Sequence, residues 1–347
     1  MGEHPNTSLV VRVPEGGSPK LVLEDLPRPS PGRGQVLVKL SHVAQNPTDI
    51  QSFESNAFGD GAVLGCDYVG EVVELGDGVS RLAKGDVVAG LIWGGEIKGL
   101  GGYSSYSIAD ENICFKLPVG LSREHASTVP LAATTAWLAL FSKDSLGLDR
   151  SNAAGTGVLV WGGSSSVGLY TVQLASLYGF EVIATCSPRH ADLVRSYGAK
   201  HVFDYRDEKV IEKIQATVPN LKHVFDTIGN QSSSTLSSQA TQKNSRLCTV
   251  RPGKANTENV TADTRVTDVL VWTAFLKDHR YGKFHWPASK HDHELSRELF
   301  ENLPKWLSDG TIKPSEPKVY EGLKSVADGF QEYRDRKISA YKIVYRV

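Results

Sequence analysis

Short apolar runs separated by glycine- and proline-containing turns fill the first part of the chain. Four of these runs have the length and alternation of β-strands, namely Leu9–Val13, Leu21–Asp25, Gln35–His42 and Ala62–Leu75. Apolar residues at helical spacing are rare in this part of the sequence. Several short strands with little helix predict a compact domain built like a β-barrel.

The pattern changes at Ser122, where a helical stretch leads into alternating strands and helices. Apolar runs of strand length recur over residues 157–250, and their alternation with helices predicts a parallel sheet. Near the C-terminus the sequence predicts a helix at Asp292–Ser308 and a strand at Ala340–Val347. We therefore expect an α/β fold with a β-rich domain and a doubly wound parallel sheet. The expected domain boundaries are residues 1–125 with 305–347 returning, and residues 126–304.

The clearest local pattern lies in residues 158–190. An apolar strand ends at Trp161, a glycine-containing turn follows, and a helical pattern then continues to Gly179, which has the position of a helix C-cap. Glu181–Cys186 has the composition of the next strand. This order of strand, turn, helix and strand is the context in which a glycine motif binds phosphate.

Unpaired N–H groups and the helix dipole at the start of such a helix favour a bound pyrophosphate. Gly162 permits the tight turn, and Gly168 lets the helix approach the strand closely. Ser165 stands where the usual motif has its middle glycine, so we expect it to keep an ordinary φ. The alternative is a βα turn that binds no anion. The expected pyrophosphate-binding residues are Gly162, Gly163, Ser164, Ser165, Ser166, Val167 and Gly168.

The end of the second strand indicates which dinucleotide binds. An NAD site would place a carboxylate there, about 20 residues beyond the glycines, to bind the ribose 2′-hydroxyl. This chain has Ser187, Pro188, Arg189 and His190 instead. A hydroxyl, a guanidinium and an imidazole suit a 2′-phosphate, so the sequence favours NADPH. The alternative is that Arg189 is an ordinary solvated arginine.

Two further positions follow later strands of the same domain. Tyr205 lies beyond the third strand, where it could contact the adenosine end of the cofactor or be a half-buried strand tyrosine. Pro252 and Gly253 follow the fifth strand, and ligands bind at the carboxyl ends of such strands. We expect this pair to border the nicotinamide.

The composition is that of an ordinary globular protein. The 347 residues carry a net charge of −1, with 40% hydrophobic and 22% charged residues. This balance gives no general attraction for nucleic acid or for an anionic membrane, and a cytoplasmic location is the expectation. The four cysteines lie far apart without a CxxC pair, so their spacing predicts neither a disulfide framework nor a zinc knuckle.

Five sequence blocks occur in an order known from one family. They are Asn46-Pro47-Thr48-Asp49, Leu64–Gly70, Gly85–Val88, Val158–Gly168 and Gly198–Tyr205. With these blocks the chain resembles the medium-chain dehydrogenase/reductase superfamily over nearly its whole length. Within it, the sequences GGSSSVG and TCSPRH look most like the fungal enoyl reductases that act in trans with polyketide synthases.

The resemblance implies a GroES-like domain, a Rossmann domain and NADPH as cofactor. It also implies hydride transfer to the β-carbon of an α,β-unsaturated acyl thioester, carried on the acyl carrier protein of a polyketide synthase. Zinc-bearing relatives have a cysteine near the position of Asn46 and Gly-His-Glu where this chain has Gly65-Cys66-Asp67, and they have a four-cysteine lobe that is absent here. Cys66 alone could not hold zinc, so we expect no metal.

The resemblance assigns further roles to residues of the first turn, of a helix and of a later segment. Relatives commonly have lysine where this chain has Gln51, and an amide cannot neutralise a phosphate or enolate in the same way. We expect the catalytic residues to be Thr48, Gln51 and Thr135. Further expected cofactor contacts are Asn46, Pro47, Thr48, Asp49, Ile338 and Ser339. The expected substrate contacts are Thr134, Thr135, Ala136, Leu270, Val271, Trp272, Thr273 and Phe275.

Two other functions fit the same sequence. One is a zinc-independent reductase of free quinones or enones, and the other is a non-catalytic regulator that binds NADPH. The run Val269–Trp272 likewise has two interpretations, as an edge strand for dimerisation or as the floor of an acyl pocket.

Overall fold

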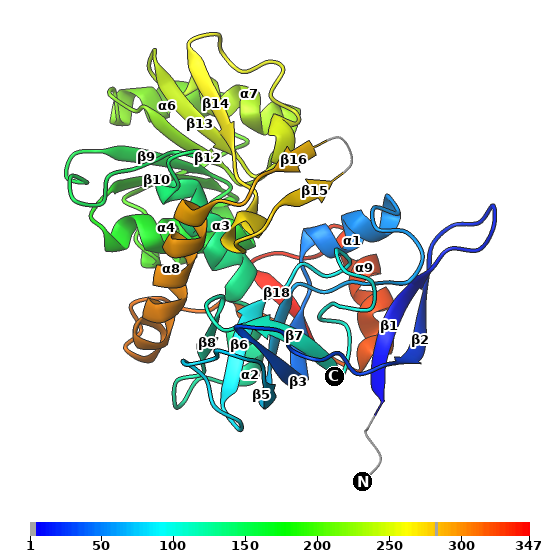
Figure 1. Ribbon diagram of the computed structural model, residues 1–347. Coiled ribbons are helices and arrows are strands. Elements are labelled where there is room, and N and C mark those ends of the chain that lie inside the picture. The colour runs from blue at the N-terminus through cyan, green and yellow to red at the C-terminus, as the bar shows by residue number, and fades with distance from the viewer. Residues whose placement is uncertain (1–4, 282–283) are drawn as a thin grey trace. The chain divides into compact units, whose positions relative to one another are not determined.

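The structure is a computed structural model that describes residues 5–281 and 284–347. These residues form two compact units (Figure 1). The first unit contains the described residues up to Leu131, residues 280–281 and Phe300–Val347, and the second contains Ala132–His279 and Phe284–Leu299. No helix among the described residues is both long and apolar enough to span a membrane.

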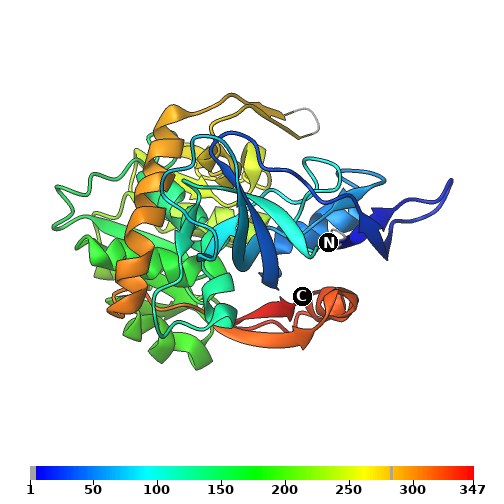
Figure 2. The ribbon, with the colours of Figure 1, turned by 60° about the horizontal axis from the view of Figure 1, so that its bottom comes forward.

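The first unit is built on β-sheets, as the alternating apolar runs predict. One sheet has the strand order β17-β18-β3-β5-β6-β8, with β7 paired to β3, and a smaller sheet has the order β2-β1-β4. Figure 2 shows β17 and β18 side by side next to helix α9. The strands are β1 (Asn6–Arg12), β2 (Lys20–Leu26), β3 (Gln35–Ala44), β4 (Ala62–Val63), β5 (Asp67–Leu75), β6 (Val87–Leu91), β7 (Tyr106–Asp110), β8 (Cys114–Lys116), β17 (Glu316–Glu321) and β18 (Tyr341–Arg346). The helices are α1 (Pro47–Glu54), α2 (Arg123–Ser127) and α9 (Val326–Arg334).

One expected strand of this unit is interrupted. The run Ala62–Leu75 was expected to be continuous, but it forms β4 and β5 in two different sheets. Gly65, between them, has a φ of 92°, a conformation that side chains rarely adopt. A Cβ at this position would also lie 2.7 Å from the backbone nitrogen of Tyr103. The glycine therefore turns the chain from one sheet into the other.

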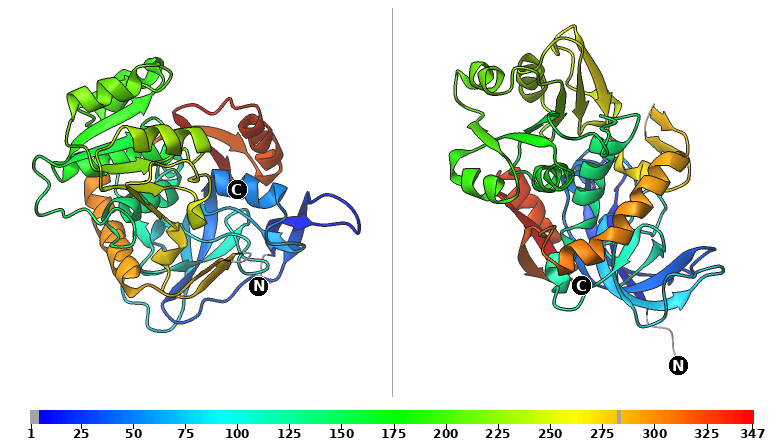
Figure 3. Two further views of the ribbon diagram at one scale, coloured as in Figure 1. Left: turned by 90° about the horizontal axis from the view of Figure 1, so that it is seen from above. Right: turned by 90° about the vertical axis from the view of Figure 1, so that its left-hand side faces the viewer.

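The second unit contains a six-stranded parallel sheet with the order β11-β10-β9-β12-β13-β14. The chain steps outward from β9 in one direction through α4 and α5, and in the other through α6 and α7. Because such crossovers are right-handed, the two helix pairs cover opposite faces, as Figure 3 shows. The elements are α3 (Pro130–Phe141), β9 (Gly157–Trp161), α4 (Ser166–Leu177), β10 (Glu181–Cys186), α5 (Ala191–Ser196), β11 (His201–Asp204), α6 (Val210–Thr217), β12 (His223–Asp226), α7 (Gln231–Gln239), β13 (Ser245–Thr249) and β14 (Thr264–Asp268). β16 (Phe284–Trp286) also belongs to this unit, whereas β15 (His279–Tyr281) and α8 (Lys290–Ser308) contain residues of both units.

These observations confirm the expected fold class, a mixed α/β chain with a doubly wound parallel sheet. The order of strands reverses between β9 and β12, and ligands of such sheets bind beyond the carboxyl ends of the strands at this point. One expectation at the sheet edge is wrong. Val269–Trp272 is not an edge strand, because β14 ends at Asp268 and Val271–Ala274 forms a short 3₁₀ helix.

Candidate functional site

The glycine turn after β9 is held from both sides by threonines. Gly162 has a φ of 89°, so the turn needs glycine at this position. From β10, the Thr185 side-chain oxygen accepts a hydrogen bond from the Gly162 N–H at 3.1 Å. On the other side, the Thr227 hydroxyl donates to the carbonyl oxygen of Trp161 at 2.9 Å. The turn is thereby fixed to both strands that flank β9.

The start of helix α4 has the geometry that the variant motif predicts. Ser165 has a φ of −68°, and its hydroxyl oxygen caps the helix by accepting the N–H of Gly168 at 2.9 Å. The same hydroxyl lies 2.8 Å from the hydroxyl of Thr227. A Cβ at Gly168 would lie 2.2 Å from the carbonyl oxygen of Gly162, so the helix does approach the turn too closely for any larger residue.

One hydroxyl at the start of this helix is placed to form a hydrogen bond with a bound ligand. The Oγ atom of Ser166 is buried and has no hydrogen-bond partner among the described residues. A buried polar atom without a partner costs free energy unless a ligand or water satisfies it. It stands at the first position of α4, beside N–H groups that have no partner within the helix. These residues therefore suit the pyrophosphate of a dinucleotide.

The residues after β10 form a short cationic turn. Pro188–His190 is a 3₁₀ helix, with Ser187 before it and the Arg189 side chain exposed. Burial lowers the pKa of His190, and the positive charge of Arg189 lowers it further. The turn contains no carboxylate, so it offers donors suited to a phosphate and lacks the acceptor for a ribose 2′-hydroxyl.

The expected adenosine contact lies directly after β11. Tyr205 is 39% exposed, so it is available to a ligand. Its ring lies under the guanidinium of Arg206, whose central carbon is 5.0 Å from the ring centroid. The sequence analysis did not name Arg206 as a site residue. Its position directly after Tyr205, a predicted adenosine contact, is the signal that could have identified it.

The loop after β12 is shaped by a buried aspartate that the sequence did not single out. The carboxylate of Asp226 accepts the N–H groups of Ile228 and Gly229, both at 3.0 Å, and the hydroxyls of Ser233 and Ser234 at 2.7 and 2.8 Å. Burial raises the pKa of Asp226, while these hydrogen bonds oppose the rise. The carboxylate fixes the loop beside the glycine turn.

A hydrogen bond joins the turn after β13 to the last residue of β14. The N–H of Gly253 donates to the Asp268 carboxylate at 2.6 Å, and Gly253 has a φ of 72°. Pro252 precedes it in a short 3₁₀ helix. Within the second unit, the expected cofactor residues 162–168, 187–190, 205 and 252–253 thus all follow the carboxyl ends of parallel strands.

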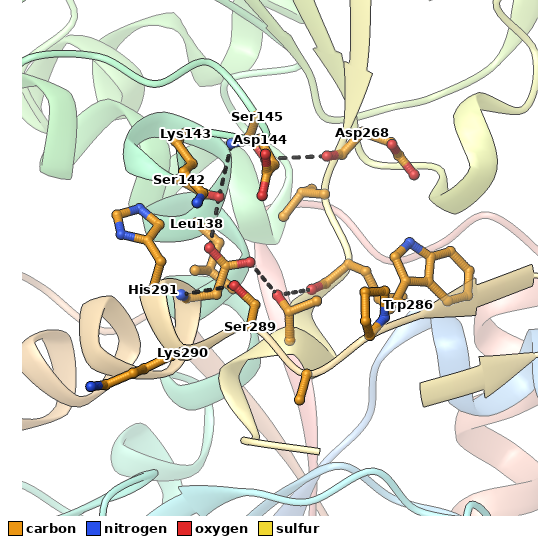
Figure 4. A pocket seen from close by; sticks show the side chains of 16 residues that line it. Leu138, Ser142, Lys143, Asp144, Ser145, Asp268, Trp286, Ser289, Lys290 and His291 are labelled. Carbon is orange, nitrogen blue, oxygen red and sulfur yellow. Dashed lines mark hydrogen bonds between the residues drawn. The ribbon is translucent and has the colours of Figure 1, made fainter. Parts of the chain in front are cut away.

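Two of the expected substrate residues, Leu270 and Thr273, line a cavity of about 430 Å³ in the second unit (Figure 4). The Thr273 hydroxyl donates to the buried carboxylate of Asp292 at 2.7 Å, and Ser142 donates to the other carboxylate oxygen at 2.7 Å. Thr134, Thr135 and Ala136 lie buried on α3 and do not line this cavity, nor do Val271, Trp272 and Phe275.

In the first unit, Asn46 and Asp49 form the start of helix α1. The N–H of Asn46 donates to the Asp49 carboxylate at 2.7 Å, and Pro47 occupies the first helical position. Thr48 is half-buried, and the Gln51 amide donates to the Tyr333 hydroxyl at 3.1 Å. The expected cofactor residues Ile338 and Ser339 are also half-buried, in the segment before β18.

The Asp49 side chain is enclosed inside the first unit. It is 1% exposed and also accepts the Gly65 N–H and the Tyr103 hydroxyl, both at 3.2 Å, and the Cys66 thiol at 3.3 Å. Burial raises the pKa of Asp49 to about 6. Its carboxylate therefore positions the start of α1 and the Gly65 turn, and it has no free face for a ligand.

A second buried carboxylate links three parts of the first unit. Asp67 is fully buried, and it accepts the Asn46 amide at 2.8 Å and the Leu131 N–H at 2.6 Å. It also forms an ion pair with Lys342 of β18, which is buried too. These contacts give Asp67 a structural role. Lys342 was missed because it lies 275 residues away in the sequence.

Comparisons with known proteins match both units. Residues 32–119 match the alcohol dehydrogenase GroES-like domain, and residues 166–272 match the zinc-binding dehydrogenase family. A trans-enoyl reductase from Aspergillus sclerotiorum is 33% identical over 351 residues, which cover 94% of this chain and 96% of that protein. The chain belongs to the medium-chain dehydrogenase/reductase superfamily. The resemblance inferred from the sequence blocks is thereby confirmed.

Other relatives within the superfamily have different names. A zinc-type alcohol dehydrogenase-like protein from Schizosaccharomyces pombe is 31% identical over 341 residues, covering 94% of this chain and 96% of that protein. Among solved structures, the CurK enoyl reductase has a TM-score of 0.78 at 20% identity and 99% coverage of both chains. A quinone oxidoreductase from Coxiella burnetii has a TM-score of 0.73 at 20% identity, again over 99% of both chains. At these identities the structures establish the fold alone.

The donor set at the superfamily's zinc position differs in this chain. In the described residues, no group of three or more histidine, cysteine, aspartate or glutamate side chains could hold a metal ion. Cys66 donates its thiol hydrogen to Asp49, and burial raises the pKa of this thiol well above its ordinary value. A buried thiol held in its protonated form is a poor zinc ligand.

Proposed function

We propose that this protein is an NADPH-dependent enoyl reductase of the cytoplasm. In this proposal it reduces the carbon–carbon double bond of an α,β-unsaturated acyl thioester, carried by the acyl carrier protein of a polyketide synthase. Two neighbouring features of the second unit carry the proposal. One is the capped start of α4, where the buried Ser166 hydroxyl has no partner among the described residues. The other is the cationic turn after β10. The several relatives named trans-enoyl reductases support the choice of reaction.

The cofactor site is proposed to use both of these elements. The first turn of α4 would bind the pyrophosphate through its N–H groups and the Ser166 hydroxyl. Arg189 and Ser187 would bind the 2′-phosphate, because a guanidinium can form two parallel charged hydrogen bonds to phosphate oxygens. When bound, NADPH supplies the hydride for the reduction.

The protein's own contribution to the chemistry is positioning and charge stabilisation. We propose that the Thr48 and Thr135 hydroxyls and the Gln51 amide act as hydrogen-bond donors, to the cofactor or to the thioester oxygen on which negative charge develops. The Gln51 amide is already oriented by Tyr333. The described residues around Cys66 form no set of zinc ligands, so we propose that the reaction proceeds without a metal ion.

The decisive experiment follows the absorbance of the reduced nicotinamide. The purified protein is offered a carrier-bound enoyl thioester, a pantetheine enoyl thioester, a quinone and a free enone, with NADPH or NADH. We expect turnover of thioesters, fastest on the carrier, and a strong preference for NADPH. Reduction of quinones or free enones alone would instead support the free-substrate reductase, and NADPH binding without oxidation would support a regulator.

A Thr135→Val variant separates a donor role from a packing role. Valine keeps the shape and removes the hydroxyl, so the melting temperature reports any structural role of this buried hydroxyl and kcat reports its role as a donor. Loss of a transition-state donor should lower kcat by about tenfold or more at an unchanged melting temperature. Thr128→Val, at a buried threonine outside the expected site whose hydroxyl donates to the His125 carbonyl oxygen, is the control.

A further inference from the structure

The second unit has a small cavity at the amino ends of its parallel strands, whereas the glycine turn lies at their carboxyl ends. The cavity measures about 280 Å³ and lies where β12, β13 and β14 begin. Since all strands of this sheet are parallel, the cavity and the expected cofactor residues lie at opposite strand ends. It is therefore not part of the site described above.

Positively charged or titratable side chains line this cavity from three adjacent strands. His223 of β12 pairs with Arg246 of β13, and Arg246 pairs with Arg265 of β14. Residues paired in this way point to the same face, on strands about 4.8 Å apart. Lys222, directly before β12, also lines the cavity and adds a positive charge. Like charges at neighbouring positions destabilise a sheet unless something of opposite charge offsets them.

No carboxylate supplies that opposite charge in the described structure. Neither aspartate nor glutamate lines the cavity, and Lys222, Arg246 and Arg265 form no ion pair with any described residue. Arg246 is held in place by its hydrogen bond to the Leu146 carbonyl oxygen at 2.8 Å. Burial lowers the pKa of His223, and the positive charges of Arg246 and Lys222 lower it further. Arg246 is thus fixed in the cavity, and Lys222 and Arg265 add exposed positive charges with no carboxylate among the lining residues.

We propose that this cavity is a binding site for a small phosphate-class anion, such as inorganic pyrophosphate or a compact phosphate ester. Arginine presents a planar array of donors that matches phosphate oxygens, and lysine adds a point charge. The volume admits a group of this size. The bound anion would offset the repulsion among Lys222, Arg246 and Arg265.

The test measures binding of inorganic pyrophosphate by calorimetry at low, constant ionic strength, where charge interactions are little screened. The variants are Arg265→Gln and the double variant Lys222→Gln/Arg265→Gln, whose side chains are exposed and leave the Arg246 contact intact. We expect the affinity to fall about tenfold in the first and about a hundredfold in the second, because each removes a charged donor. Arg297→Gln, an exposed arginine of α8 outside the cavity, should leave the affinity unchanged.

The glycine turn could also bind pyrophosphate, and the same variants separate the two sites. Binding there is independent of Lys222 and Arg265, so it would persist at full affinity in the double variant. Pyrophosphate affinity that is equal in the wild type and the double variant would overturn the proposal. So would the absence of any binding heat at millimolar pyrophosphate. Neither result would bear on the proposed reductase activity.

Discussion

The buried ion pair between Asp67 and Lys342 makes a strong prediction about stability. The two side chains are 0% and 3% exposed, so neither charge is solvated. In Asp67→Asn the charge of Lys342 would remain buried without its partner. Breaking a buried pair in this way costs about 3–5 kcal/mol. Asparagine can still accept the Leu131 N–H, but its NH2 group would then face the Asn46 amide and the Lys342 ammonium, which are both donors. We therefore expect the upper end, about 5 kcal/mol of unfolding free energy.

A double-mutant cycle tests the reasoning. Lys342→Met alone should also destabilise the protein, because it leaves the Asp67 carboxylate buried without a positively charged partner. The double variant should recover part of the loss, since removing both charges leaves no buried ion without a partner. Asp335→Asn is the control, because its partner Lys337 is 66% exposed, and its unfolding midpoint should not change.

The assay must report on the first unit, because a two-unit protein need not unfold in one step. Urea unfolding followed by hydrogen exchange in peptides from α1 and β18 meets this need. The expected result is lost protection in both peptides in Asp67→Asn, together with a lower urea midpoint. A loss below about 1 kcal/mol, or strict additivity of the two single variants, would refute the argument that the buried pair is coupled.

Three further predictions follow from the site. Arg189→Ala should weaken NADPH binding by about 1.5–3 kcal/mol and leave NADH nearly unchanged in a fluorescence titration, and an unaltered preference would remove Arg189 from the site. Gly168→Ala places a Cβ 2.2 Å from the Gly162 carbonyl oxygen, so α4 must move, and calorimetry should find a lower melting temperature and weaker cofactor binding. Burial raises the pKa of Asp49 to about 6, so the folded state binds a proton that the unfolded state releases near pH 4. Stability should therefore fall by up to about 3 kcal/mol as pH rises from 4 to 6, and urea midpoints of Asp49→Asn should lack this slope.

Features that depend on neighbouring residues could be predicted from the sequence. The order of β9, α4 and β10, the ordinary φ of Ser165 and the close approach at Gly168 all follow from residues within one short stretch. Features that depend on which strands become neighbours could not. Thr227 lies beside the glycine turn only because β12 pairs with β9, and no local pattern reveals that pairing.

Gln51 illustrates how a contact between distant residues changes the meaning of a substitution. In the sequence it is a departure from the lysine common among relatives, and the departure suggests only a lost charge. In the structure its amide donates to Tyr333, which lies 282 residues away on α9. A lysine would place a charge at this half-buried position, whereas the amide is held by a neutral hydroxyl. The contact with Tyr333 therefore accommodates a neutral amide, and in the proposed reaction this position supplies a donor without charge.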